Sequence, residues 1–523
     1  MNKNLYFAFA ILILAAVIGI YFRPLLIIDE TRYIGVAWEM FDKNSFLVPF
    51  KNGEPYHHKP PFLFWLMHLN WLLFGVNEIA VRFIPLLFGL GSLLLTYKIY
   101  LTLWSDDKNT AANSALILSG TFIFAFYTSL VMFDIILTFW VLLGILGIIR
   151  AAKCGGKRAF VLIALSIGFG TLTKGPVILV HLLPLVIFAK IWAKDIDKRF
   201  FLGFSASFFG GVFIALLWAI PAGIAGGKEY SDAIFWGQSA NRMVKSFAHQ
   251  REFWWYLPII PFLLFPWFFF KNFWMGAKNS EIDAGIKLLL VWLVSVVFIF
   301  SLISGKQIHY LMPEIAGFSL LCARYLSFVD IKEKLKNRAS YIGHFYIVFS
   351  ISLLAAYFIV ANKTPHQIEF YRVVIGTLLL LGVGIYFIKR RFEDFDLLLK
   401  YISTSSVVAI FVIHFIMSSV MKDLDLSEFS QKLSSFQEQN ITIVHDGKYH
   451  DQYHFVGRLH KPLLVIKDKM KLKEYLKTHQ KALVITYKKR KEPLEESKII
   501  TKTGFKNKYA VLLKAKMYEE IKK

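Results

Sequence analysis

The chain has 523 residues, of which 56% are hydrophobic and 18% are charged. Soluble domains are usually about 45–50% apolar and about 25% charged. The apolar excess falls in long blocks, which excludes an ordinary soluble globular protein and favours a polytopic membrane protein. The net charge of +24 does not indicate nucleic acid as a partner, because the cytoplasmic loops of membrane proteins collect Lys and Arg. Cys154 and Cys322 indicate neither a disulfide framework nor a cysteine-based metal site.

The apolar blocks predict about 13 membrane spans, since roughly 20 apolar residues are needed to cross the hydrocarbon. The first block lacks a small-residue cleavage site, so we expect it to be a retained span and not a signal peptide. The predicted spans are 5–27, 80–103, 111–129, 132–149, 159–175, 176–193, 200–222, 255–270, 285–303, 308–328, 341–361, 371–388 and 397–418.

The distribution of basic residues predicts the orientation of these spans. Loops 150–158, 190–199, 329–340 and 389–400 each contain four Lys or Arg, whereas the turn at 129–134 contains none. Positively charged loops stay in the cytoplasm. The N-terminus is therefore predicted to be cytoplasmic, and an odd number of spans places the C-terminal part outside.

Long outer segments are predicted at 28–79 and 223–254, within a membrane domain of residues 1–419. The stretch FLFWLMHLNWLLFG (62–75) is too short for a span and predicts a helix in the membrane interface. The second segment ends in REFWWYLP, whose aromatic residues are typical of the membrane–water boundary.

Residues 420–523 form a separate domain. Short apolar runs (ITIV, PLLVI, ALVITY and YAVLL) alternate with charged helical stretches, which predicts a small α/β fold. This segment contains 23 Lys and Arg against 13 Asp and Glu, a net of +10. An anionic lipid partner or membrane surface explains that charge as well as a simple lysine-rich soluble surface does.

Polar side chains that could act in catalysis or ligand binding gather on the predicted outer face. Lys, Arg and Tyr suit a phosphate group, while acids beside them need another task, such as orienting the cations, binding a metal or stabilising positive charge on a sugar. These candidates are Asp29, Glu30, Arg32, Tyr33, Glu54, Tyr56, His57, His58, Lys59, Asp134, Lys174, Asn241, Arg242, His249, Arg251, Lys306, His309 and Tyr310.

Each candidate has a structural alternative. Asp29 and Arg32 are spaced to form a local helix pair, and His249 alone is typical of a hydrogen-bonded structural histidine. Asp134 favours a functional role, because a carboxylate between two spans is costly without a partner.

Three segments together carry a family resemblance: DETRYIGVAWEMF, NGEPYHHKPPFLFWL and FGVNEIAVRFIPLLFG, in this order. They resemble the aminoarabinose transferase family of lipid A glycosyltransferases, which is related to protein O-mannosyltransferases. The resemblance implies a glycosyltransferase C fold with about 13 transmembrane helices, here with a small C-terminal α/β periplasmic domain.

The implied activity is inverting transfer of an amino sugar, aminoarabinose or galactosamine, from undecaprenyl phosphate to a lipid A phosphate. The reaction belongs to the periplasmic face of the bacterial inner membrane, and by lowering negative surface charge it implies polymyxin resistance. Membrane lipids are the other expected partners, and nucleic acid is not expected.

The resemblance also implies residue roles. It assigns Asp29 and Asp134 to the reaction centre, and it associates Arg32, Lys59 and Tyr310 with the lipid phosphate. Glu30 is a further predicted catalytic acid. By residue type and outer position, further predicted ligands of the phosphate are Tyr33, Tyr56, Lys174 and Lys306. A divalent metal, zinc, is implied at His249, but His58 stands where many relatives have Glu. Two interpretations stay open: His58 and His249 bind zinc, or the metal is absent.

Other functions predict different sequence features. A lipid-linked sugar transporter predicts repeats with interrupted helices, and no repeat is found between the halves. A non-catalytic lipid-binding protein leaves the acid–base cluster of the first outer segment without a task. A polyprenyl-phosphate-sugar transferase acting on protein or another glycan is the remaining alternative.

Overall fold

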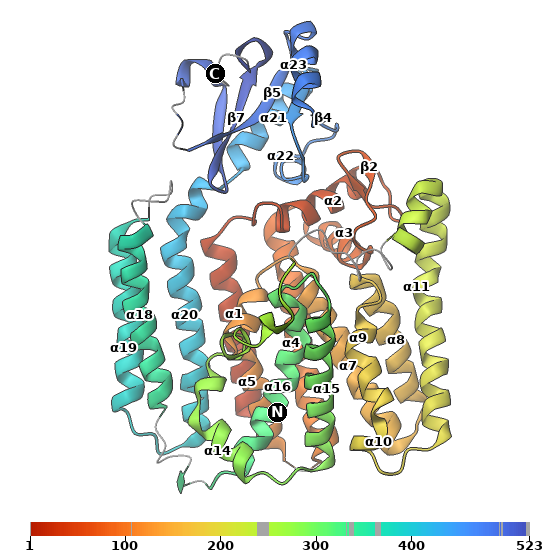
Figure 1. The fold of residues 1–523 in the computed structure, drawn as a ribbon, viewed down its shortest axis with the longest axis vertical. Coiled ribbons are helices and arrows are strands. Elements are labelled where there is room, and N and C mark those ends of the chain that lie inside the picture. The colour runs from red at the N-terminus through yellow and green to blue at the C-terminus, as the bar shows by residue number, and fades with distance from the viewer. Residues whose placement is uncertain are drawn as a thin grey trace.

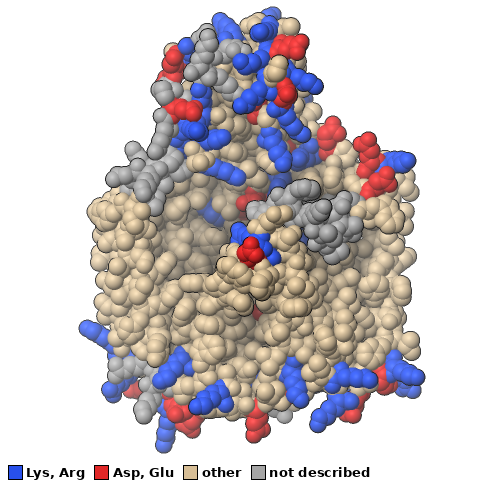
Figure 2. Space-filling view, in the orientation of Figure 1, with Lys and Arg blue, Asp and Glu red and all other residues tan. Residues whose placement is uncertain are grey.

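The computed structural model describes residues 2–105, 107–237, 250–330, 332–333, 339–360, 368–490, 492 and 495–518. Figure 1 shows a body of long, roughly aligned helices with a small α/β domain standing on one end. We call the end that carries this domain the outer end. On the face drawn in Figure 2, a broad band of the body is without charged residues, and Lys and Arg, with some Asp and Glu, gather beyond it at both ends. This distribution matches a protein whose middle lies in hydrocarbon.

Eight helices of the described chain are long and apolar enough to cross a membrane, and the chain is a multi-pass membrane protein. The helices of the body are α1 (Lys3–Phe22), α4 (Glu78–Leu103), α5 (Lys108–Ser119), α6 (Phe122–Tyr127), α7 (Phe133–Cys154), α8 (Lys157–Lys174), α9 (Ile178–Ile187), α10 (Ala189–Trp192), α11 (Lys198–Asp232), α13 (Ile260–Leu263), α14 (Lys271–Asn279), α15 (Ala284–Leu302), α16 (Met312–Ser327), α18 (Ser340–Val360), α19 (Phe370–Lys389) and α20 (Phe395–Asp423).

The predicted count of about 13 spans is not confirmed, because several predicted spans are divided. The block 111–129 is split into α5 and α6 at Gly120, and 176–193 is split into α9 and α10. The block 255–270 contains only short helical turns, η2 (Phe253–Tyr256), α13 and η3 (Trp267–Phe269). Its three prolines, at positions 258, 261 and 266, remove backbone donors and prevent a continuous helix.

The first outer segment folds over the outer end of the body. It consists of α2 (Glu30–Asp42), a hairpin of β1 (Phe50–Lys51) and β2 (Glu54–Pro55), and α3 (Phe62–Phe74). α3 lies where the sequence predicts the interfacial helix. One of its faces is buried, and His68 on that face donates a ring N–H to the Ala37 carbonyl, 2.9 Å away. Leu69, Leu72 and Phe74 remain exposed, as expected for a helix at a lipid boundary.

The C-terminal domain contains the predicted α/β fold. Its five-stranded sheet has the order β4 (Leu464–Ile466), β3 (Ile443–Asp446), β5 (Leu483–Lys489), β7 (Lys508–Lys514) and β6 (Thr501–Phe505). β3 is parallel to β4 and β5, whereas β7 is antiparallel to β5 and β6. The four predicted strands are confirmed. The sequence TKTGF of β6 has few apolar residues, which is why its pattern did not predict a strand.

This domain is docked on the first outer segment. Its helices are α21 (Ser427–Glu438), α22 (His454–Gly457) and α23 (Lys469–Thr478), with short turns η5 (Glu496–Lys498) and η6 (Ala515–Met517). The ring of Phe455 on α22 stacks on Trp71 of α3 with 5.4 Å between centroids. Trp38 of α2 donates its indole N–H to the Leu459 carbonyl, 3.0 Å away. The domain therefore forms a fixed cap over α2 and α3.

Close helix packing in the body depends on glycine at chosen positions. A Cβ at Gly144 of α7 would lie 2.4 Å from Ser166 Oγ and 2.9 Å from a methyl of Leu182. We expect Gly144→Ala to lower the stability of the detergent-solubilised protein by about 1–3 kcal/mol through overpacking, measured as a lower Tm. Gly382→Ala is the matched control, since Gly382 of α19 has no atom within 4 Å of such a Cβ. Equal Tm values for the two variants would contradict the packing described here.

Candidate functional site

The Glu30 carboxylate joins three segments at the outer end. The Arg23 guanidinium, at the end of α1, forms a buried ion pair with it. Its oxygens also accept from the backbone N–H of Leu26, 2.9 Å away, and of Val131, 2.7 Å away, in the turn between α6 and α7. Arg23 in turn donates to the Ser129 carbonyl of the same turn, at 2.6 Å. Glu30 therefore fixes the start of α2 against the start of α7.

Glu30 is ionised in this position. Burial alone would raise its pKa, but Arg23, together with the more distant Arg82, holds the pKa below its ordinary value. Glu30 is 0% exposed and its oxygens are already bonded. This geometry indicates a positioning role and gives no support for the predicted catalytic role of Glu30.

Arg82 extends this network into α4. It is 1% exposed and donates to the carbonyls of Arg23, at 3.0 Å, and Gly19, at 3.1 Å. Asn77, earlier in the same motif, caps α4 by accepting from the Ala80 N–H at 2.7 Å. The Gly-Val-Asn-Glu-x-x-x-Arg motif therefore anchors the helix that supports the site.

Asp29 immediately precedes Glu30, but Glu30 is buried and Asp29 is not. Its side chain is exposed. The residue before it, Ile28, has a φ of 74°, which a β-branched residue rarely adopts. The Ile28 N–H donates to Thr31 Oγ at 2.9 Å. This strained turn separates the buried Glu30 from the accessible Asp29, and such strain is typical of functional sites.

Asp134 and Lys174 form a second ion pair beside Asp29. Asp134 lies in the first turn of α7, where the helix dipole favours an acid, and Lys174 is the last residue of α8. The Lys174 ammonium lies 2.5 Å from the Asp134 carboxylate and 4.8 Å from the centre of the Tyr310 ring. The side chain of Asp134 is only 3% exposed and that of Lys174 only 10%. The predicted partner of the buried Asp134 is therefore Lys174.

Arg32, Tyr33 and Lys59 form a cationic and aromatic wall next to this pair. The Arg32 guanidinium donates to the Tyr33 hydroxyl at 3.2 Å. The rings of Tyr33 and Phe133 meet edge to face at 4.9 Å, and the Lys59 ammonium lies 5.4 Å from the Phe133 ring centre. Phe133 and Asp134 are the first two residues of α7. The N-terminus of α7 therefore supports both the wall and the ion pair.

Electrostatic neighbours connect the two groups. The Asp134 carboxylate interacts electrostatically with His309, Lys174 and Lys59. The Arg32 guanidinium interacts in the same way with Tyr56 and Asp29. The structure thus brings together Asp29, Arg32, Tyr33, Tyr56, Lys59, Asp134, Lys174 and Tyr310. Figure 2 shows charged side chains in a hollow between the C-terminal cap and the body.

Lys306 is engaged elsewhere. It is 2% exposed, and its ammonium donates to the carbonyls of Arg251, at 2.9 Å, and Ile303, at 2.7 Å. These bonds hold the turn after α15. They give no support for the predicted contact between Lys306 and a lipid phosphate.

Of the predicted zinc pair, the structure describes one residue, His58. His58 is exposed, and its ring lies 4.4 Å from that of His57 and 5.4 Å from that of Tyr56. His249 lies outside the described residues, as do the candidates Asn241 and Arg242. Zinc at His58 and His249 therefore stays a prediction.

His309, one of the predicted candidates, is an electrostatic neighbour of Asp134, and its ring centre lies 6.1 Å from that of Tyr127 and 5.1 Å from that of Tyr310. Arg23, in contrast, was not predicted as a functional candidate. Arg23 lies at the end of the first apolar block, where a basic residue is usual at the end of a membrane span. For Arg23, the available signal was the acidic pair Asp29 and Glu30, six and seven residues later.

An apolar groove opens on the side of the body near the site. It has a volume of about 510 Å³ and is lined by η2, α13, α15 and α16. Trp254, Leu257 and Phe298 on its walls are exposed, and Leu311, which follows Tyr310, also lines it. An exposed apolar groove of this size suits a hydrocarbon chain.

Comparisons with known proteins agree with the resemblance. Residues 58–224 match the family model described as dolichyl-phosphate-mannose-protein mannosyltransferase. The undecaprenyl phosphate-alpha-4-amino-4-deoxy-L-arabinose arabinosyl transferase of Enterobacter sp. (strain 638) is 28% identical over 58% of this chain and 56% of its own length. Transferase 1 of that name from Pseudomonas fluorescens is 29% identical over 68% of this chain and 65% of its own. The matches thus span less than two thirds of these relatives.

The fold is that of a solved enzyme structure. ArnT from Cupriavidus metallidurans bound to undecaprenyl phosphate superposes with a TM-score of 0.77 over 97% of both chains, at 15% sequence identity. The predicted glycosyltransferase C fold and the resemblance to the aminoarabinose transferase family are confirmed.

The Glu30 network predicts a sharp difference between neighbouring acids. Glu30→Ala leaves the Arg23 guanidinium buried without its counter-ion, which costs about 3–5 kcal/mol. We therefore expect a strongly lowered Tm of the purified protein, or loss of folded protein from the membrane fraction. Asp29→Ala is the control: an exposed residue next in sequence should change stability by less than about 0.5 kcal/mol. If both variants behave alike, Glu30 does not hold the outer end together.

Proposed function

We propose that this chain is a glycosyltransferase that moves an amino sugar from undecaprenyl phosphate to a phosphate of lipid A. We place the reaction on the periplasmic face of a bacterial inner membrane, with the N-terminus cytoplasmic and the C-terminal domain periplasmic. The observation that carries the proposal is the exposed Asp29 beside the wall of Arg32, Tyr33 and Lys59. The ArnT-like fold and the names of the relatives support the choice of donor and acceptor.

The lipid phosphate is proposed to bind at Arg32 and Lys59. Within the described part of the chain, the buried Arg32 Nε has no hydrogen-bond partner, so the guanidinium has a donor left for a phosphate oxygen. A planar guanidinium can hold phosphate through two N–H groups, and a lysine adds a point charge. Lys174 is paired with Asp134 at 2.5 Å, and we propose that it positions Asp134 in addition to its predicted place near the lipid phosphate.

The bond that breaks joins the sugar C1 to the oxygen of undecaprenyl phosphate. Its electron pair stays on that oxygen, where Arg32 and Lys59 stabilise the negative charge in a site partly shielded from water. The new bond joins C1 to an oxygen of the acceptor phosphate, and attack from the opposite side inverts C1. Positive charge that develops on the sugar is placed near the carboxylates of Asp29 and Asp134.

Little proton transfer is needed for this acceptor. A phosphate of lipid A is already ionised at neutral pH, so a general base contributes little. Asp29 is therefore proposed to align the reactants and balance charge. Zinc at His58 and His249 remains part of the proposal only as a structural ligand pair, and no step depends on it.

The polyprenyl chain is proposed to lie in the apolar groove beside Tyr310. Exposed Trp254, Leu257 and Phe298 would cover an isoprenoid chain that enters from the bilayer. Because the chain comes from hydrocarbon and not from water, the groove contributes van der Waals packing that orients the chain, while the phosphate sets the position.

A protein acceptor is the second candidate, because the matching family model is named for protein mannosyl transfer. Mass spectrometry of lipid A from cells with and without the gene separates the two. We expect an added amino sugar on a lipid A phosphate only when the gene is present, and its mass distinguishes aminoarabinose from galactosamine. Unchanged lipid A together with altered glycoproteins would favour the second candidate and contradict our proposal.

The role of Asp29 can be tested by removing its charge alone. We expect Asp29→Asn to reduce transfer at least about 100-fold, the scale of one lost electrostatic group in an active site, without lowering Tm. Transfer is measured as modified lipid A per amount of folded protein. Glu54→Gln, at another exposed acid of the same segment, should retain activity. Full activity of Asp29→Asn would remove this residue from the reaction centre.

A further inference from the structure

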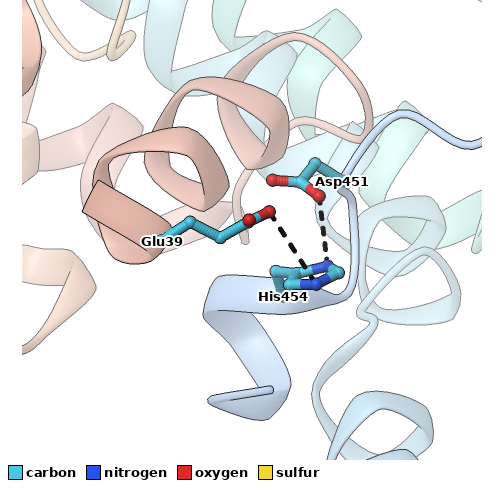
Figure 3. Close-up of side chains that lie close together, drawn as sticks. All are labelled: Glu39, Asp451 and His454. Carbon is cyan, nitrogen blue, oxygen red and sulfur yellow. Dashed lines mark ion pairs between the residues drawn. The ribbon is translucent and has the colours of Figure 1, made fainter. Parts of the chain in front are cut away.

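Three metal-ligating side chains meet where the C-terminal domain rests on α2. Glu39 comes from α2, whereas His454 begins α22 of the C-terminal domain and Asp451 lies in the loop just before it (Figure 3). They are 5%, 0% and 1% exposed. The cluster lies outside the site described above and includes neither His58 nor His249.

The ligand atoms of these residues converge. One nitrogen or oxygen from each lies within 4.8 Å of the others. His454 Nε2 is 3.8 Å from a Glu39 oxygen, and His454 Nδ1 is 3.1 Å from Asp451 Oδ1. Nδ1 also faces the Tyr449 hydroxyl at 2.8 Å. A hydrogen bond at Nδ1 is the usual arrangement when Nε2 binds a metal.

Several polar atoms of the cluster are left unsatisfied. Among the residues that the structure describes, both Asp451 oxygens and His454 Nε2 are buried without a hydrogen-bond partner. Such atoms are rare in folded proteins, because burying them without a partner costs free energy. Glu39, in contrast, is oriented by the Gly53 N–H at 2.7 Å and by the Asn52 N–H. The unsatisfied atoms point toward the carboxylate that is already fixed.

The backbone around Asp451 is shaped for this approach. Asp451 has a φ of 65°, a conformation that costs free energy and persists where the surroundings require it. A Cβ at Gly35 of α2 would lie 2.8 Å from the Asp451 carbonyl and 2.9 Å from its Oδ2. α2 therefore has a glycine where the Asp451 loop comes closest.

The charges of the cluster suit a cation. The carboxyl groups of Glu39 and Asp451 meet the His454 imidazole in one buried cluster, where a cation offsets the repulsion between two carboxylates. Two lysines border the cluster: Lys43 lies 3.5 Å from a Glu39 oxygen with its side chain 35% exposed, and Lys51 is an electrostatic neighbour of Asp451.

We propose that Glu39, Asp451 and His454 bind one divalent cation of the zinc class, which ties the C-terminal domain to α2. An imidazole with carboxylate ligands is a donor set that zinc accepts. The ligands come from segments more than 400 residues apart, so the cation crosslinks the cap to the membrane body. α2 also carries Arg32 and Tyr33, about two turns before Glu39. The proposal does not depend on the proposed function.

The test uses the full-length protein purified in detergent, with the variant His58→Ala/His249→Ala as background so that the other predicted zinc pair is removed. We expect one equivalent of zinc per chain by elemental mass spectrometry. Extraction with a chelator should lower Tm, and added zinc should restore it. X-ray absorption at the zinc edge should report one imidazole among oxygen ligands.

Variants separate the cluster from its surroundings. Asp451→Asn and His454→Gln should lose the equivalent of zinc and the response of Tm to chelator. His460→Gln is the matched control, because His460 also contacts α2, at Asp42, across the same joint but outside the cluster. The proposal is overturned if the background protein holds no zinc after reloading and Tm ignores chelator, as expected for two carboxyls that share a proton. It is also overturned if the zinc stays in His454→Gln.

Discussion

The buried carboxylate of Glu30 is the contact on which the outer end depends. It binds the Arg23 guanidinium at the end of α1 and accepts from two backbone N–H groups, one of them at Val131 just before α7. A charge this deep is stable only with such partners. The two acids of the site are Asp29 and Asp134. Asp29 immediately precedes Glu30, and Asp134 follows Val131 by three residues. One ion pair therefore sets the separation of both.

The remaining parts of the site follow from this anchor. Asp134 holds Lys174 at the end of α8, and Lys174 lies over Tyr310. Phe133 supports Tyr33 and Lys59 on its other side. The chain thus separates charges that hold the scaffold, which are buried and paired, from those that face the hollow. This division explains why acids and cations occur together at a membrane surface.

Sequence patterns were most informative where one local rule decides the structure. The apolar blocks predicted the long helices, and the short β-rich runs predicted four strands of the cap. The DETRY and HHKPP segments predicted which residues approach each other, because a family pattern already encodes tertiary contacts. Broken spans were missed because hydropathy does not register the prolines at 258, 261 and 266, which interrupt a helix inside an apolar block.

What sequence could not supply was the pairing of charges. Asp29 and Glu30 are adjacent acids, and only the fold decides which is buried. Lys306 and Lys174 occupy similar glycine-flanked turns, yet Lys306 is bound by carbonyls and Lys174 by a carboxylate. The approach of Glu39 to Asp451 and His454 joins distant segments, and no periodicity predicts it. Such contacts depend on the docking of the cap, which is set by the packing of Phe455 on Trp71 and not by local propensity.

The central claim is that the charges around Asp29 transfer a sugar from a polyprenyl phosphate. It is tested most directly with the purified protein in vesicles that contain lipid A and isotope-labelled undecaprenyl phosphate–aminoarabinose. The account predicts labelled sugar on a lipid A phosphate together with an equal amount of released undecaprenyl phosphate. Release of labelled free sugar without modified lipid A, or no consumption of the donor by folded protein, would contradict it.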